Sequence, residues 1–300
     1  MSINYRNRWH DYTSRCIYMV TITKSPECPS FGFLRGSTNI PVGTPGSVYL
    51  KSTDLGDQIK DAIRNFPIVS PKVRILQYAL MPDHLHLILF VESTTEEILG
   101  RIIARFKVEI CKKSGISNVF EKGFNDQILN KNRKLDVLFR YLKENPWRLA
   151  IRRERPDFFK KVNELTIENV RCQAYGNMHL LLNPFKEQVI VHRADSEAKR
   201  ALNRDLWLYT AANGGVLVSP FISKAEKCIR GEAENLGGNI ILIRNEPLGK
   251  RDKPSGRDFD LCTKGKLLLL SPIDPDITGK TLSREVCLRL NDMAKTIAAT

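Results

Sequence analysis

The chain has 300 residues, of which 42% are hydrophobic and 27% are charged, so it can bury ordinary cores and is not collagen-like, low-complexity or wholly disordered. Its length favours two domains. A formal net charge of +14 favours a polyanionic partner, with nucleic acid as the first candidate and a surface kept cationic for solubility as the alternative.

The first half of the chain carries most of the basic excess and shows a clear succession of elements. Asp54 is expected to cap the first helix, and Pro146 is expected to end the last one. The order favours a ferredoxin-like α/β sandwich with an antiparallel sheet. The predicted elements are a strand at 16–23, a Pro-, Gly- and Ser-rich excursion at 25–47, a helix at 54–65, strands at 74–81 and 84–91, and helices at 95–113 and 135–145.

A charged segment near Arg152 to Pro156 marks the expected boundary, which divides the chain into domains 1–158 and 159–300. The second domain alternates strands with helices, and this predicts a smaller, Rossmann-like α/β domain. Ser223 and Glu226 form an expected capping box. The predicted elements are strands at 189–192, 216–221, 239–244 and 266–271, with helices near 195–210 and 224–236.

The strand at 84–91 carries the most informative pattern, Met81-Pro-Asp-His-Leu-His86. Residues two apart on a strand project from the same face, so His84 and His86 point the same way, while the leucines between and after them form an apolar face. Two imidazoles in this position can converge on one metal ion. The alternative is a pair of polar residues on a solvated sheet face.

The helix at 135–145 carries Tyr141 outside the centre of its apolar stripe, and Asn145 lies one turn later on the same side. A phenol and an amide oxygen would therefore face one cleft. The alternative is a tyrosine that covers the edge of the core and an asparagine that ends the helix.

Taken together, the two segments resemble the single-tyrosine HUH endonucleases, and most closely the REP-associated tyrosine transposases of the insertion-sequence 200/605 group. The resemblance covers about residues 10–155. Within it, Asp126 matches a single Asp in an aromatic-rich segment, and Lys107 matches a Phe-Lys pair. Asp83 departs from the family, which usually has Asn there, and its carboxylate could either tighten metal binding or repel phosphate.

The resemblance implies a metal-dependent endonuclease and strand transferase that acts on single-stranded DNA beside a hairpin. Tyr141 would attack a DNA phosphate and form a 5′-phosphotyrosine link. His84 and His86 would hold Mg²⁺ or Mn²⁺, with Asn145 as the third ligand. Because one tyrosine serves each subunit, a complete reaction needs either a homodimer or reuse of the same residue.

Basic residues near this site are expected to contact the DNA backbone as a group, although a solvated helix face explains each one separately. They are Arg101, Arg105, Lys107, Lys112, Arg148 and Arg152.

The second domain loosely resembles DprA-type DNA-processing proteins through its strand-Ser-Pro turns. It has no GxGxxG and no P-loop, so no nucleotide cofactor is predicted. It would be an accessory DNA-binding domain or an assembly domain without a ligand.

The seven scattered cysteines form no CxxC pair, which disfavours a zinc site. No apolar leader and no membrane span are visible, so we expect a cytoplasmic protein without a membrane partner. Two alternative functions remain open: a domesticated relative that binds hairpin DNA or RNA without cleaving it, and a phosphodiesterase that uses water.

Overall fold

The computed structural model describes residues 7, 9–129, 135–249 and 252–300. These residues form two compact units, Met1–Ile151 and Arg152–Thr300, which are described separately below. The division falls inside a helix, seven residues before the predicted boundary, and the units are nearly equal in length. No helix in the described ranges is long and apolar enough to span a membrane.

Four antiparallel strands form the main sheet of the first unit, in the order β4 (Val73–Leu80), β5 (His84–Val91), β1 (Cys16–Thr23) and β6 (Asn125–Leu129). Helices α1 (Asp54–Val69) and α2 (Leu99–Ser114) connect β1 to β4 and β5 to β6. This β-α-β-β-α-β succession on an antiparallel sheet is ferredoxin-like, so the predicted fold class is confirmed here.

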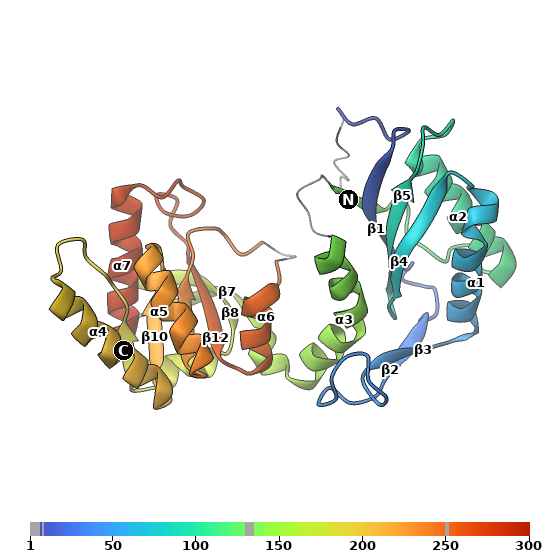
Figure 1. Ribbon diagram of the computed structural model, residues 1–300. Helices are drawn as coiled ribbons and strands as arrows, with labels where there is room; N and C mark the ends of the chain where they lie inside the picture. Colours follow the sequence, from blue (N-terminus) through green and yellow to red (C-terminus); the bar gives the residue numbers. More distant parts are fainter. Residues whose placement is uncertain (1–6, 8, 130–134, 250–251) are drawn as a thin grey trace. The chain divides into compact units, whose positions relative to one another are not determined.

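The sheet is covered on both faces (Figure 1). Leu85 and Leu87 have no exposed surface and pack in the core with α1 and α2. Burying each leucine stabilises the fold by about 1.5–3 kcal/mol relative to leaving it exposed. On the opposite face, Ile88 packs against Leu142 of helix α3 (Leu135–Glu154). The alternation in β5 therefore separates a helix-packed core from a face that α3 approaches.

The Pro-, Gly- and Ser-rich excursion contains a small antiparallel hairpin of β2 (Gly32–Arg35) and β3 (Tyr49–Ser52). The chain just before β2 is fixed to the turn between β4 and β5, because the Phe31 N–H donates to the Pro82 carbonyl at 3.0 Å. The connecting loop is fixed to α3, because Trp147 Nε1 donates to the Thr38 carbonyl at 3.0 Å. The excursion is therefore tied to both elements that carry the predicted site.

Several predicted helix ends differ from the structure, and α1 runs to Val69 instead of ending at 65. Thr53, not Asp54, caps α1, because its hydroxyl accepts from the Gly56 N–H. Helix α2 begins at Leu99 rather than Thr95, since the Thr95 N–H donates to the Thr13 carbonyl instead of entering the helix.

Helix α3 does not end at Pro146 but continues to Glu154. A proline inside a helix costs about 3 kcal/mol through a lost hydrogen bond and a clash. The buried apolar residues Leu142 and Ile151, on either side of Pro146, offset that cost by packing against the rest of the fold.

The second unit is built on a six-stranded mixed sheet, in which four parallel strands are continued by an antiparallel pair. This arrangement matches the predicted Rossmann-like class, although the strand predicted at 189–192 lies at 186–188. The order is β7 (Lys160–Ile167), β8 (Val170–Gly176), β12 (Leu267–Pro272), β11 (Asn239–Ile243), β10 (Val216–Ser219) and β9 (Lys186–Gln188).

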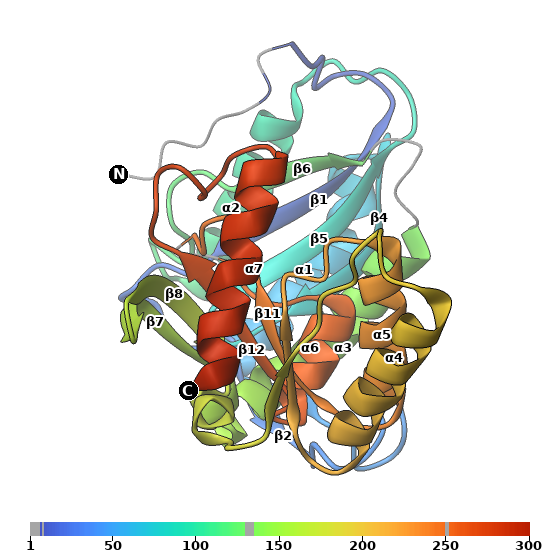
Figure 2. The same ribbon diagram turned by 90° about the vertical axis from the view of Figure 1, so that its left-hand side faces the viewer.

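Helices cover both faces of this second sheet. One face packs on α4 (Glu197–Ala212), α5 (Lys224–Asn235) and α6 (Gly256–Thr263), and the other packs on α7 (Arg284–Ala299) and the short helix η2 (Met178–Leu182). Figure 2 shows α7 apart from α4 and α5. The Ser223–Glu226 capping box at the start of α5 is present as predicted. Helix η1 (Pro156–Phe159) leads into β7, and the sequence did not predict β6, β7, β8, α6 or α7.

Candidate active site

His84 and His86 stand on the face of β5 that α3 approaches. Their Nε2 atoms lie 3.1 Å apart, and their ring planes are inclined at 78°. With metal–nitrogen bonds of about 2.0–2.2 Å, this separation is that of two neighbouring ligands of one ion. The strand pattern therefore brings the two predicted ligands together.

Both imidazoles are held by hydrogen bonds at the opposite ring nitrogen. Nδ1 of His84 lies 2.7 Å from an Asp83 carboxylate oxygen, and Nδ1 of His86 lies 2.8 Å from the Thr21 hydroxyl. Because a carboxylate only accepts, Nδ1 of His84 is the donor in this bond, and Nε2 is the nitrogen turned towards His86. Such partners orient metal-binding histidines. Asp83 thus contacts His84 on the side away from His86.

The sequence did not point to Thr21. It lies directly opposite His86 in the pairing of β1 with β5, so its side chain shares the histidine face. Burial, followed by the nearby His84, lowers the pKa of His86 to about 3. The His86 ring is therefore neutral at physiological pH, which is the form that binds metal.

Tyr141 of α3 also reaches this face. Its ring centre lies 6.3 Å from that of His86. The Arg148 guanidinium lies 5.5 Å from the tyrosine ring centre and donates two hydrogen bonds to the Glu144 carboxylate. Arg148 is only 8% exposed, so it holds a fixed positive charge beside the phenol rather than a solvated one. Arg148 forms a buried ion pair with Glu144, and its predicted contact with the DNA backbone stays a prediction.

Asn145 is 4% exposed, and its Nδ2 atom has no hydrogen-bond partner in the described structure. Leaving a buried polar atom unpaired costs about 1–3 kcal/mol. The amide also carries an oxygen, which is the atom that a cation would bind.

The donor set fits a divalent cation. Among the described residues, no cluster of three or more His, Cys, Asp or Glu exists that could hold a metal, so a third protein ligand would have to be of another type. The buried Asn145 amide, on the same helix as Tyr141, is a candidate of that type. Two or three protein ligands leave positions for water and phosphate oxygens.

The other predicted residues are not at this site. Asp126 lies on the opposite face of the sheet, beside Val20, and accepts a hydrogen bond from the Tyr12 hydroxyl at 2.8 Å. Lys107 donates to the backbone carbonyls of Glu121 and Gly123, and burial lowers its pKa to about 8. Both residues join segments of the fold.

Three of the remaining basic residues lie on the sheet face opposite the histidines, and the fourth belongs to the second unit. Arg101, Arg105 and Lys112 lie on α2, which packs on the other face of the sheet. Arg152 belongs to the second unit, where its guanidinium lies 5.8 Å from the Phe259 ring centre.

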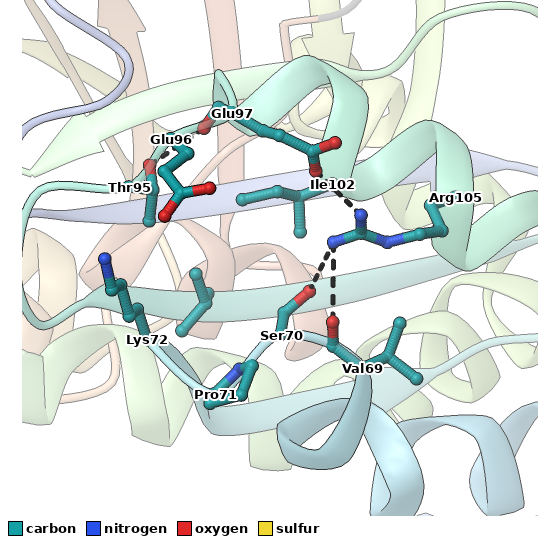
Figure 3. A pocket seen from close by; sticks show the side chains of 10 residues that line it. Val69, Ser70, Pro71, Lys72, Thr95, Glu96, Glu97, Ile102 and Arg105 are labelled. Atoms are coloured by element: carbon teal, nitrogen blue, oxygen red, sulfur yellow. Dashed lines mark hydrogen bonds and ion pairs between the residues drawn. The ribbon is translucent and has the colours of Figure 1, made fainter.

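A surface pocket of about 350 Å³ beside α2 does not belong to the histidine site (Figure 3). Arg105 crosses it, pairs with Glu97 at 2.8 Å, and donates to Ser70 and the Val69 carbonyl. The guanidinium in this pocket is therefore satisfied by the protein itself. Its predicted role in DNA binding stays a prediction.

No known protein family's sequence profile matches the chain. An uncharacterised protein of Haemophilus influenzae is 25% identical over 166 residues, which covers 47% of this chain and 86% of that protein. A solved REP-associated tyrosine transposase bound to a REP hairpin is similar over 47% of this chain and 72% of its own length, with 13% identity and a TM-score of 0.35.

A "putative transposase" from Deinococcus radiodurans R1 is similar over 47% of this chain and 96% of its own length, with 14% identity and a TM-score of 0.26. The likeness of the second unit to DprA-type proteins is tested by none of these similarities and stays a prediction.

Proposed function

We propose that the first unit is a metal-dependent endonuclease and strand transferase for single-stranded DNA, with Tyr141 as its nucleophile. The observation that carries the proposal is the convergence of the His84 and His86 Nε2 atoms at 3.1 Å on the face reached by Tyr141. A sheet that only needed to pack would gain more from apolar residues at these positions than from two imidazoles.

His84, His86 and Asn145 would hold the cation, and Mg²⁺ or Mn²⁺ suits a set with an amide oxygen and open positions. When bound, such an ion polarises a scissile phosphate and stabilises the negative charge that develops in the transition state. Asp83 and Thr21 keep the two imidazoles in the orientation that presents Nε2.

The Tyr141 hydroxyl oxygen would attack the phosphorus of the scissile phosphate. A tyrosine–phosphorus ester forms, and the bond to the 3′-oxygen breaks. The phenol loses one proton and the departing 3′-oxygen takes one up, so the count of bound protons is unchanged. Because the ester preserves the energy of the broken phosphodiester, a 3′-hydroxyl can attack it and complete strand transfer without ATP.

Arg148 would act on the tyrosine rather than on the metal site. Its buried guanidinium lies 5.5 Å from the Tyr141 ring centre and favours the negative charge that the phenol oxygen acquires as it attacks. The resemblance in the motifs adds a hairpin beside the cleavage point and a homodimer in which each subunit supplies one tyrosine.

The test is a search for a covalent adduct. The full chain is incubated with Mn²⁺ and labelled single-stranded DNA that carries hairpins from the flanks of its own gene, then run on a denaturing gel. We expect a protein–DNA band that maps to Tyr141 by mass spectrometry and is lost in EDTA and in Tyr141→Phe. Tyr78→Phe, on β4, is the matched control that keeps the band.

Two results would overturn the proposal. Hairpin binding without an adduct would identify a non-cleaving DNA- or RNA-binding relative. Cleavage by Tyr141→Phe at the wild-type rate would identify a phosphodiesterase that uses water as the nucleophile.

A further inference from the structure

The outer face of the β2–β3 hairpin presents two aromatic rings and two cations. The register places Phe33 opposite Lys51, and Arg35 opposite Tyr49. All four side chains are exposed, whereas Leu50, between Tyr49 and Lys51, turns to the core. We call Phe33, Arg35, Tyr49 and Lys51 the hairpin platform.

Neither aromatic of the hairpin platform is packed. Phe33 is 58% exposed and Tyr49 is 53% exposed. They occupy diagonal positions on one antiparallel pair, where neighbouring residues lie about 7–8 Å apart and their Cβ atoms lie somewhat closer. Two exposed aromatic side chains side by side indicate an interaction surface rather than a core.

The charge of the hairpin platform is of one sign. From Cys28 to Thr53 the sequence contains Arg35 and Lys51 but no Asp or Glu. The structure gives neither Arg35 nor Lys51 an ion pair within the described residues. Both cations are therefore available to a polyanion, and no carboxylate of this segment repels one.

Two hydrogen bonds, one on each side of β2, tie the excursion to the chain near His84 and near Asn145. The Phe31 N–H, next to β2, donates to the carbonyl of Pro82, two residues before His84. The loop after β2 accepts at Thr38 from Trp147, two residues after Asn145. Figure 1 shows β2 and β3 beyond the ends of the main strands and beside α3.

We propose that the hairpin platform binds the single-stranded DNA that leads to the cleavage site, with bases stacked on Phe33 and Tyr49 and phosphates paired with Arg35 and Lys51. This inference rests on the proposed function. Single-stranded DNA is the occupant that the surface fits, because unpaired bases offer flat faces to aromatic rings while their phosphates need cations. In a duplex the bases are stacked on one another, so their flat faces are not open to the aromatic rings.

The test measures binding of a labelled 20-nucleotide oligothymidine to the full chain by fluorescence anisotropy. We expect Phe33→Ala/Tyr49→Ala to weaken binding by roughly 5- to 150-fold for each base that loses its stacking partner. Phe33→Tyr/Tyr49→Phe keeps both rings and should bind as the wild type does. Ile68→Ala, at a still more exposed apolar position on α1, is the control and should change nothing.

The cations give a separate readout. Arg35→Gln/Lys51→Gln should lower the slope of log Kd against log salt by about 1.4 if both cations contact single-strand phosphates. A 20-base-pair duplex should bind Phe33→Ala/Tyr49→Ala and the wild type equally well. An unchanged oligothymidine Kd in a double-alanine variant with a native melting temperature, or an equal loss on the duplex, would overturn the inference.

Failure of this inference and failure of the proposed function are distinguishable. If the Tyr141 adduct forms but oligothymidine binding does not depend on Phe33 and Tyr49, only the role of the hairpin platform is overturned. Binding that depends on both rings, without any adduct, overturns the nuclease and leaves the hairpin platform as the surface of a non-cleaving protein.

Discussion

The Nε2 atoms of His84 and His86 face each other at 3.1 Å, while the Nδ1 atom of each ring is hydrogen-bonded. Two lone pairs that face each other repel unless a proton or a cation lies between them. The geometry therefore makes the metal-binding role testable through the groups that hold the two rings.

Replacing Thr21 tests the orientation of His86. Thr21→Val removes the hydroxyl 2.8 Å from His86 Nδ1 but keeps the shape of the side chain. We expect Mn²⁺ affinity, measured by calorimetry, to fall by about 10–100-fold, as with other groups that support a metal-binding histidine. Thr23→Val, at the neighbouring position of β1 on the same face, is the control. Equal affinities for Thr21→Val and the wild type would rule out this support.

Low pH should destabilise the metal-free protein through His86. Burial lowers the pKa of His86 to about 3 in the fold, against an ordinary value of 6.5. Below pH 6.5 His86 binds a proton in the unfolded chain but not in the folded chain, so stability falls as the pH drops from 6.5 towards 3. Between pH 7 and pH 5 this contribution is about 2 kcal/mol.

Urea unfolding in EDTA at the two pH values measures this effect. The wild type should lose about 2 kcal/mol more than His86→Gln, which has no proton to gain. A His86→Gln variant that loses as much stability as the wild type would place the acid sensitivity elsewhere in the chain.

Asn145 should show a conflict between stability and metal binding. Its buried Nδ2 has no partner, so Asn145→Leu removes a desolvation cost of about 1–3 kcal/mol and should raise the free energy of unfolding of the metal-free protein. The same change removes the amide ligand and should weaken Mn²⁺ binding. A destabilised Asn145→Leu variant with undiminished Mn²⁺ affinity would show that the amide serves packing instead.

Some of the site could be predicted from local patterns. The convergence of His84 and His86 follows from the two-residue period of a strand, and it needs no knowledge of the rest of the fold. Thr21 could not be found this way, because it meets His86 only through the register between β1 and β5, and 65 positions separate the two residues along the chain.

Tertiary contacts overrode local signals elsewhere. Pro146 locally predicts a helix end, yet burial of Arg148 and Ile151 carries α3 onward. The sequence around Lys107 is typical of an exposed basic residue on a helix. In the structure, its ammonium group instead donates hydrogen bonds to the backbone carbonyls of Glu121 and Gly123. In each case the deciding contact comes from packing around the residue rather than from its neighbours in sequence.

Arg148 could either contact a DNA phosphate or act on Tyr141, and one substitution distinguishes the two roles. If it contacts a DNA phosphate, Arg148→Met should lower the slope of log Kd against log salt by about 0.7. Its burial and its 5.5 Å distance from the Tyr141 ring instead favour a role in positioning and charge. We expect the rate of adduct formation to fall about tenfold, since such a contact is worth up to about 2 kcal/mol, while Kd and its salt slope stay unchanged.

Arg101→Met is the control for this experiment, because Arg101 is exposed on α2, on the other face of the sheet. It removes the same charge from the unit without touching Tyr141, so the adduct rate should hold. If Arg148→Met lowers the slope of log Kd against log salt but leaves the adduct rate unchanged, Arg148 contacts the DNA backbone instead. If the adduct rate falls and the salt slope is unchanged, the Glu144–Arg148 pair positions Tyr141 for attack on the scissile phosphate.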